Sequence, residues 1–165
     1  MPEIRRATFS DIPAVGAMLE NLFLSSRYSK PGWALDRDQM YGMLFQCVAA
    51  NAAPVDGAQA IFVAMSDEGK PCGVIVGGIG KTYQCLSESA ATDYIWFTEK
   101  SSKTPAGAAE GLIDAFHAWA ASGGVRRQVH IISETGVVSP HVVMRLMRRK
   151  GFAVTGYVME REIEI

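Results

Sequence analysis

The chain has 165 residues, of which 48% are hydrophobic and 20% are charged, which suits one domain with a normal core and excludes a disordered protein. A net charge of −1 gives no strong field toward nucleic acid or anionic membranes. No apolar run approaches the ~20 residues of a membrane span, no signal core opens the chain, and three distant cysteines show no metal-ligand or redox spacing. We therefore expect a single cytoplasmic domain over residues 1–165, with reduced thiols and no metal or membrane partner.

The N-terminal third predicts one strand and two helices. Residues 3–8 are expected to form a short strand, and Ser10 is placed to cap a helix with Asp11 in its first turn. Apolar residues at helical spacing between positions 12 and 23 give that helix one buried stripe. A second helix is expected over residues 36–50.

Two apolar runs then predict a β-hairpin. They cover residues 60–66 and 72–79, and the Asp-Glu-Gly-Lys sequence between them is a turn signal. The second run contains Gly73, Gly77 and Gly78 and is followed by Gly80. Glycines in such a strand mark a bulge or a close approach of a ligand, or they belong to the loop at its end.

The centre of the chain combines an aromatic strand with a loop of small residues. Residues 94–97 predict a strand, residues 98–103 a polar loop, and Thr104-Pro105 the start of a helix, with Thr as N-cap and Pro in the first turn. A strand, a small-residue loop and a helix start direct unpaired N–H groups toward one point, which suits a phosphate or pyrophosphate. An ordinary capped helix after an ordinary strand is the alternative.

The remaining segments complete a mixed sheet. The central helix ends at Ser-Gly-Gly 122–124, residues 128–133 predict a strand, and Ser139-Pro140 starts a helix that ends at Lys150-Gly151. Its inward residues are predicted to be Val142, Val143, Leu146 and Met147. Residues 152–163 give one or two closing strands. This order predicts an α/β (α+β) fold with helices on both faces of the sheet.

Several local sequences are typical of one family. They include Ile-Arg-Arg-Ala-Thr at 4–8 with Asp-Ile-Pro at 11–13, Glu-Gly at 68–69 before Gly-Val-Ile at 73–75, and Lys-Gly-Phe at 150–152. With the element order, the chain resembles the GCN5-related N-acetyltransferase (GNAT) superfamily over almost its whole length. Further echoes, such as Ser-Arg-Tyr at 26–28 and Thr-Gly-Val at 135–137, resemble a phage and bacterial subgroup. The resemblance implies a mostly antiparallel mixed sheet.

The resemblance also implies a function and a cofactor site. The function is an acetyl-CoA-dependent N-acetyltransferase acting on a small-molecule or protein amine, with a homodimer as a further expectation. The backbone at Phe97 and Thr98 would align the pantetheine arm of coenzyme A. The pyrophosphate would bind backbone amides of the loop, at Lys103, Thr104, Ala106, Gly107 and Ala108. This loop departs from the family's spacing of Arg or Gln and glycines, so its register is open.

Proton transfer is where the chain differs most from the family. Many members hold a Tyr four residues before the final Gly-Phe as general acid, and this chain has Met147, which cannot donate a proton. The residues expected to replace it are Glu134 as base, with Tyr157 and His141 as acids. The alternatives are a solvated carboxylate for Glu134 and a surface histidine for His141. His130, in the fifth strand, is expected to be a packed histidine.

Two features bear on the substrate. Tyr28, Trp33, Tyr41 and Phe45 would line an aromatic acceptor pocket or pack in the core. The C-terminal basic cluster is defined by Arg145, Arg148, Arg149 and Lys150. Its cations are explained by a helix C-terminus, or they contact the coenzyme 3′-phosphate or a nucleic acid. The alternative functions are a phage-type nucleic-acid-modifying enzyme on the same fold and a non-catalytic GNAT-like binding module.

Overall fold

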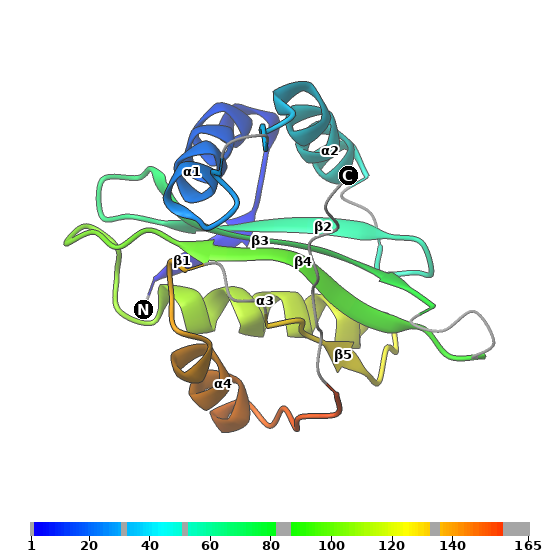
Figure 1. Cartoon of the computed structure of the whole chain (residues 1–165). Helices are drawn as coiled ribbons and strands as arrows, with labels where there is room; N and C mark the ends of the chain where they lie inside the picture. Colours follow the sequence, from blue (N-terminus) through cyan, green and yellow to red (C-terminus); the bar gives the residue numbers. More distant parts are fainter. Residues whose placement is uncertain (1, 31–32, 51–52, 82–86, 133–135, 157–165) are drawn as a thin grey trace, which may run out of the picture.

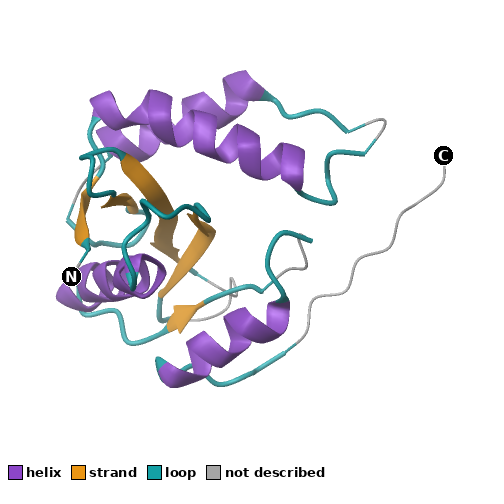
Figure 2. Ribbon diagram, turned by 90° about the vertical axis from the view of Figure 1, so that its left-hand side faces the viewer, coloured by secondary structure: helices purple, strands orange, loops and turns teal. Residues whose placement is uncertain are grey.

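The computed structural model describes residues 2–30, 33–50, 53–81, 87–132 and 136–156, arranged as one sheet between two layers of helices (Figure 1). Helices α1 and α2 cover one face of the sheet, and α3 and α4 lie on the other, as Figure 2 shows from the side. The elements in chain order are β1 (Glu3–Arg6), the 3-10 helix η1 (Phe9–Asp11), α1 (Ile12–Ser25), α2 (Arg37–Ala49), β2 (Gln59–Met65), β3 (Pro71–Gly80), β4 (Ala90–Thr98), α3 (Ala108–Ser122), β5 (Gln128–Val129) and α4 (Pro140–Arg149).

The strands follow the order β1-β2-β3-β4-β5 across the sheet. The first four are antiparallel to their neighbours, whereas β5 is parallel to β4. This mostly antiparallel mixed sheet, with helices on both faces, confirms the predicted fold class. The predicted hairpin is also confirmed, because β2 and β3 pair antiparallel. Gly69 adopts a left-handed φ of +72° in the turn between them.

The sheet is buried on both faces, which is why β2 and β3 read as continuous apolar runs. One core lies between the sheet and helices α1 and α2, with Val15, Leu44 and Val63 fully buried. The other lies under α3, where Leu112 and Phe116 are fully buried. The two cores hold the middle of the sheet rigid between the helices that position the site.

The glycines of β3 serve a bulge and close packing. A register shift between Val76 and Gly77 leaves Tyr94 as an extra residue in β4. A Cβ on Gly77 would lie 2.6 Å from the Phe116 ring and 2.6 Å from the Thr92 carbonyl oxygen. Glycine is therefore needed at Gly77 because α3 sits directly on the strand.

The start of α1 differs from the prediction. Ser10 lies inside η1, and the N-cap of α1 is Asp11. The Asp11 carboxylate accepts hydrogen bonds from the Thr8 amide at 2.7 Å and from two Arg5 nitrogens at 2.7 and 2.9 Å. The Arg5 guanidinium, together with the bonds from Thr8, lowers the pKa of the buried Asp11 to about 2.

Four predictions in the second half of the chain are wrong in whole or in part. Helix α3 begins at Ala108 rather than at Thr104-Pro105, because Gly107 takes a left-handed φ of +83°. Strand β5 is two residues long, and residues 130–132 are not in a strand. Val142 is 53% exposed, since α4 contacts the rest of the chain along another side. Residues 152–156 form no strand, and the rest of the expected closing segment lies outside the described residues.

Candidate active site

The short β4–β5 pairing leaves one edge of β4 uncovered. The pairs are Ala91 with Gln128 and Thr92 with Val129, and we call the end of this ladder the β4–β5 fork. On the other edge, β4 stays paired with β3 as far as Thr98. Within the described residues, the backbone of β4 from Asp93 to Thr98 therefore has no strand on its β5 side. Those N–H and C=O groups are available to an extended ligand.

A buried ionisable pair closes the β4–β5 fork. The Nδ1 atom of His130 lies 2.5 Å from Oδ2 of Asp93, and the two side chains are 8% and 4% exposed. The Trp96 and His130 rings pack edge to face, with 5.4 Å between their centroids. No described residue bonds the buried Oδ1 of Asp93. The sequence predicted a packed histidine but missed Asp93, because the contact depends on parallel pairing one position earlier.

The loop between β4 and α3 uses part of its own hydrogen-bonding capacity. The Thr104 hydroxyl donates to the Glu99 carbonyl at 2.9 Å, and its amide donates to the Ser101 carbonyl at 3.1 Å. The Lys103 amide donates to the Ser101 hydroxyl at 3.1 Å, and the Ala108 amide donates to the Pro105 carbonyl at 3.2 Å. The amides of Lys103, Thr104 and Ala108, three of those predicted to bind the pyrophosphate, are thus engaged within the loop.

The available amides lie one step further along the chain. In the described structure, those of Ala106 and Gly107 donate to no other residue, and the first-turn amides of Ala109 and Glu110 have no partner within their helix. A Cβ on Gly107 would meet no atom within 4 Å. The Trp96 indole donates to the Ala109 carbonyl at 3.1 Å and fixes the helix start to β4. We call residues 106–110 the α3 amide turn, and an anion fits it.

Two lysines next to this loop already have partners. The Lys103 ammonium lies 2.6 Å from the Glu68 carboxylate in the β2–β3 turn, and both side chains are largely exposed. The Lys100 ammonium donates to the Val137 carbonyl at 3.4 Å. The Lys103 ammonium can therefore contact a bound phosphate only after its ion pair with Glu68 breaks.

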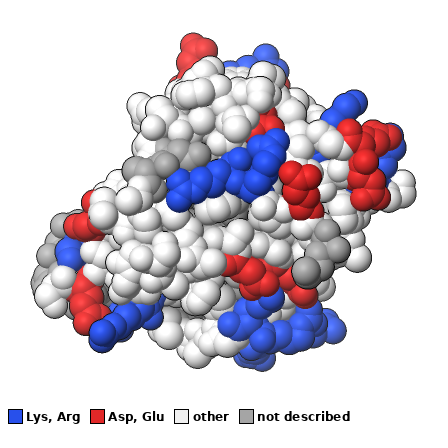
Figure 3. Space-filling view, turned by 180° about the vertical axis from the view of Figure 1, so that it is seen from behind, with Lys and Arg blue, Asp and Glu red and all other residues white. Residues whose placement is uncertain are grey.

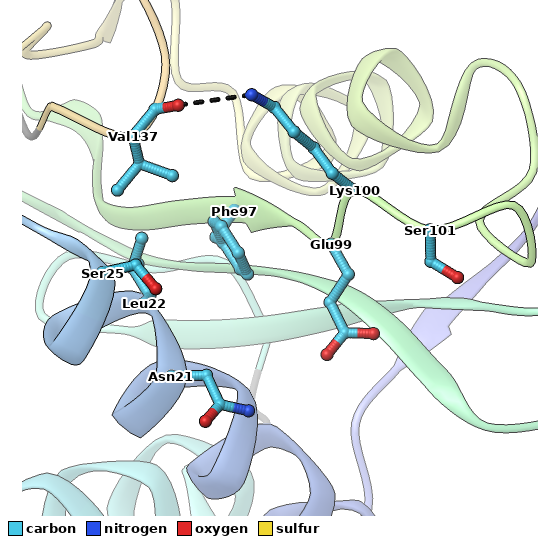
Figure 4. Close-up of a pocket in the computed structure, with 8 residues that line it drawn as sticks. All are labelled: Asn21, Leu22, Ser25, Phe97, Glu99, Lys100, Ser101 and Val137. Atoms are coloured by element: carbon cyan, nitrogen blue, oxygen red, sulfur yellow. Dashed lines mark hydrogen bonds between the residues drawn. The ribbon is translucent and has the colours of Figure 1, made fainter.

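An open pocket of about 230 Å³ lies on the other side of β4, toward α1 (Figure 4). Helix α1 contributes Asn21, Leu22 and Ser25, and β4 contributes Phe97. The loop after β4 adds Glu99, Lys100 and Ser101, and the segment before α4 adds Val137. Figure 4 shows the Glu99 carboxylate and the Asn21 amide extending into the space between α1 and β4. Three segments distant in sequence thus form a pocket of mixed polar and apolar lining, and its one carboxylate, Glu99, was not predicted.

The predicted aromatic acceptor residues lie outside this pocket. Tyr28 and Trp33 pair with each other at 6.0 Å between ring centroids. Phe45 stacks on Phe9 at the surface, and Tyr41 packs against Gly16 between α1 and α2. Tyr41 therefore packs between the two helices, as the core-packing alternative predicted, and none of the four residues lines the pocket.

The predicted proton-transfer residues are scattered. Glu134 and Tyr157 lie outside the described residues. His141 is exposed in the first turn of α4, as the surface-histidine alternative holds. Met147 is buried. The described residues contain no group of His, Cys, Asp and Glu able to hold a metal ion, and none of the described helices is long and apolar enough to span a membrane.

Arg149 and Lys150 of the C-terminal basic cluster are paired with acidic residues of α3. The Arg149 guanidinium lies 3.0 Å from Glu110, and the Lys150 ammonium 2.7 Å from Asp114. Figure 3 shows Lys and Arg side chains gathered over α4 with Asp and Glu side chains beside them. Much of the local positive charge is thus balanced within the molecule.

Comparison with solved structures shows the fold. No family profile and no curated protein matches the sequence. The aminoglycoside acetyltransferase AAC(6')-Iy, solved with a CoA-aminoglycoside bisubstrate analogue, superposes with a TM-score of 0.72 at 20% identity over 100% of this chain and 99% of that one. An acetyltransferase of Trypanosoma brucei gives 0.67 at 15% over 99% and 100%. A soil metagenomic aminoglycoside acetyltransferase with sisomicin gives 0.64 at 15% over 99% and 96%. The chain has the same fold as these acetyltransferases.

Proposed function

We propose that this protein is an acetyl-CoA-dependent N-acetyltransferase that acts on a small-molecule amine. The observation that carries the proposal is the continuity of the uncovered β4 edge with the α3 amide turn. Both belong to one segment, residues 93–110, and Trp96 ties its two ends together. In the same fold, AAC(6')-Iy was solved with coenzyme A, which supports coenzyme A as the ligand.

The residues present fit the coenzyme. The backbone of Phe97 and Thr98, on the uncovered edge, would hold the amides of its pantetheine arm, and the α3 amide turn would hold its pyrophosphate. Gly107 leaves the approach open, since a Cβ there would meet nothing. When bound, the coenzyme supplies an acetyl group activated as a thioester. The protein residues hold it in place and exclude water from the edge of the sheet.

The pocket beside α1 suits the acceptor. Glu99 places a carboxylate where a cationic group of the acceptor, other than the reacting amine, would be held, while Phe97 and Leu22 supply an apolar wall. Lys100, the cation of this pocket, donates its ammonium hydrogen bond to Val137. One structural neighbour was solved with sisomicin, which supports a small cationic amine as the acceptor class. A protein amine, a cytoplasmic location and a homodimer stay predictions of the sequence.

The test is calorimetry with acetyl-CoA, followed by thiol release with a panel of small amines. We expect micromolar binding of acetyl-CoA and turnover with at least one di- or polyamine. The Glu99→Gln variant should raise the KM for that amine by about tenfold, the loss of one charge-assisted contact, with coenzyme binding unchanged. Absence of coenzyme binding at millimolar concentration would reject the proposal.

Met147 favours a second function, a coenzyme-binding module without catalysis. Its buried thioether occupies the position where the family's general acid stands, and it cannot donate a proton. The same two measurements separate the functions, because the module would bind acetyl-CoA without releasing thiol from any amine of the panel.

A further inference from the structure

We propose that His130, oriented by Asp93, is the proton carrier of the acetyl transfer. This inference rests on the proposed function and deepens it. It assigns to the β4–β5 fork the role that sequence reasoning expected of Glu134, Tyr157 and His141.

The position of the pair carries the first part of the inference. The backbone ladder between β4 and β5 stops at Thr92 and Val129. The next residues along the chain are Asp93, still in β4, and His130, just past the end of β5. Their side chains continue the contact at 2.5 Å. The pair therefore stands where the uncovered β4 edge begins, which is the inner end of the segment that would hold the pantetheine arm.

Burial carries the second part. Both side chains are more than nine-tenths buried, and desolvating two ionisable groups is costly unless every polar atom is satisfied. Oδ1 of Asp93 is also buried, and no described residue bonds it. If the pair served packing alone, two apolar side chains would fill the same space at a lower desolvation cost. A buried carboxylate oxygen without a hydrogen-bond partner is instead typical of functional sites.

The contact fixes the chemistry of the imidazole. A carboxylate oxygen accepts, so Nδ1 of His130 carries the hydrogen that Asp93 Oδ2 receives. In the neutral ring, Nε2 is then a base. This is the arrangement in which an Asp holds a His in the tautomer that takes a proton from a nucleophile.

One ring nitrogen serves both proton transfers. The acceptor nitrogen forms a bond to the acetyl carbon while the carbon–sulfur bond breaks. His130 Nε2 takes the proton that the nitrogen gives up and returns it to the sulfur, so that amine and thioester become amide and thiol. Nitrogen and sulfur are joined to the same carbon during this exchange, which lets one base reach both. A separate acid at Met147 is then unnecessary.

The experiment uses the whole chain with the amine that turns over best. Thiol release, acetyl-CoA binding by calorimetry and thermal unfolding are measured for His130→Gln, Asp93→Asn and the double variant. His117→Gln is the matched control, because His117 is an exposed histidine of α3 whose ring lies 3.2 Å from Gln128. A His130→Ala variant assayed with added imidazole tests whether a free base restores the reaction.

We expect His130→Gln to lower kcat by about 10²–10⁴-fold, the usual contribution of a positioned acid-base group. Its coenzyme Kd and the control should stay within about threefold of the wild type, a difference under 1 kcal/mol. The double variant should be no slower than His130→Gln, because residues that act as a unit are not additive. Imidazole should restore part of the His130→Ala activity.

Two results would overturn the assignment while the proposed function stands. One is an unchanged kcat in His130→Gln. The other is a joint loss of coenzyme affinity and melting temperature that imidazole does not restore, which would make the pair a structural clasp of the sheet. A wild type that neither binds acetyl-CoA nor releases thiol refutes the proposed function, and this inference with it.

Discussion

Placing a negative charge at Gly107 tests where the coenzyme pyrophosphate binds. Gly107 has a left-handed φ of +83°, and its Cβ direction is open. A β-branched residue there would both strain the backbone and block the ligand, so a loss of affinity could not be assigned to one of the two causes. Asn and Asp both tolerate this backbone conformation better than other side chains and have nearly the same volume. The Gly107→Asp and Gly107→Asn pair therefore differs chiefly in charge.

The magnitude follows from the α3 amide turn. The carboxylate introduced by Gly107→Asp would stand roughly 5 Å from a phosphate on those amides, which gives about 3 kcal/mol of repulsion per charge pair at an effective dielectric of 20. Salt at physiological strength reduces this to about 2 kcal/mol, since the Debye length is then about 8 Å. We therefore expect Gly107→Asp to bind acetyl-CoA roughly 30-fold more weakly than Gly107→Asn.

The assay is calorimetry with acetyl-CoA at low and high salt, with thermal unfolding measured for both variants. Equal melting temperatures establish that the backbone cost is shared. The affinity gap between the variants should shrink as salt rises, because the effect is electrostatic. Equal affinities of Gly107→Asp and Gly107→Asn at low salt would refute the placement of the pyrophosphate at the α3 amide turn.

Other predictions concern the missing acid, an ion pair and the C-terminal basic cluster. Met147→Tyr should leave kcat unchanged in an active enzyme if His130 carries both protons, and a large gain in thiol release would show that the usual acid limits the rate. Asp11→Asn should cost about 2 kcal/mol of unfolding free energy at neutral pH, since a folded pKa of about 2 lies below the ordinary 3.8. In the wild type this contribution is complete above the ordinary pKa and is lost as pH falls from about 4 to 2, so the unfolding free energies of wild type and variant in urea should converge over that range. The C-terminal basic cluster should not bind duplex or single-stranded DNA at micromolar concentration in physiological salt, and salt-sensitive binding lost on charge removal would contradict this.

Much of the fold could be predicted because strong local signals agree with the tertiary structure. The apolar runs of β2 and β3 and the turn at Gly69 were enough to predict the hairpin. The starts of α2 and α4 were also predicted to within one residue. The side chain of Asp36, the N-cap of α2, accepts the Gln39 amide at 2.9 Å. The predicted start of helix α3 was wrong because the Thr104 hydroxyl donates to the Glu99 carbonyl instead of capping the helix. Helix-capping rules do not reveal such a contact.

The candidate site was predicted in outline and missed in detail. Small residues at 106–108 indicated an anion site, but which amides stay available depends on loop bonds to Ser101 and Pro105. Asp93 and Glu99 were missed because each gains its role from a segment far along the chain, His130 for the first and α1 for the second. Burial and parallel register are tertiary properties, so single-sequence patterns do not carry them.

The way α4 is attached has a consequence for local unfolding. Of the residues in α4, Met147 is buried, whereas α3 buries six side chains. Exposed ion pairs such as Arg149–Glu110 and Lys150–Asp114 each contribute only about 0–1 kcal/mol and weaken with salt. Amide hydrogens of α4 should therefore exchange with solvent through openings that leave α3 intact, and faster at high ionic strength. A protein built this way holds its sheet firmly while α4 can detach from α3.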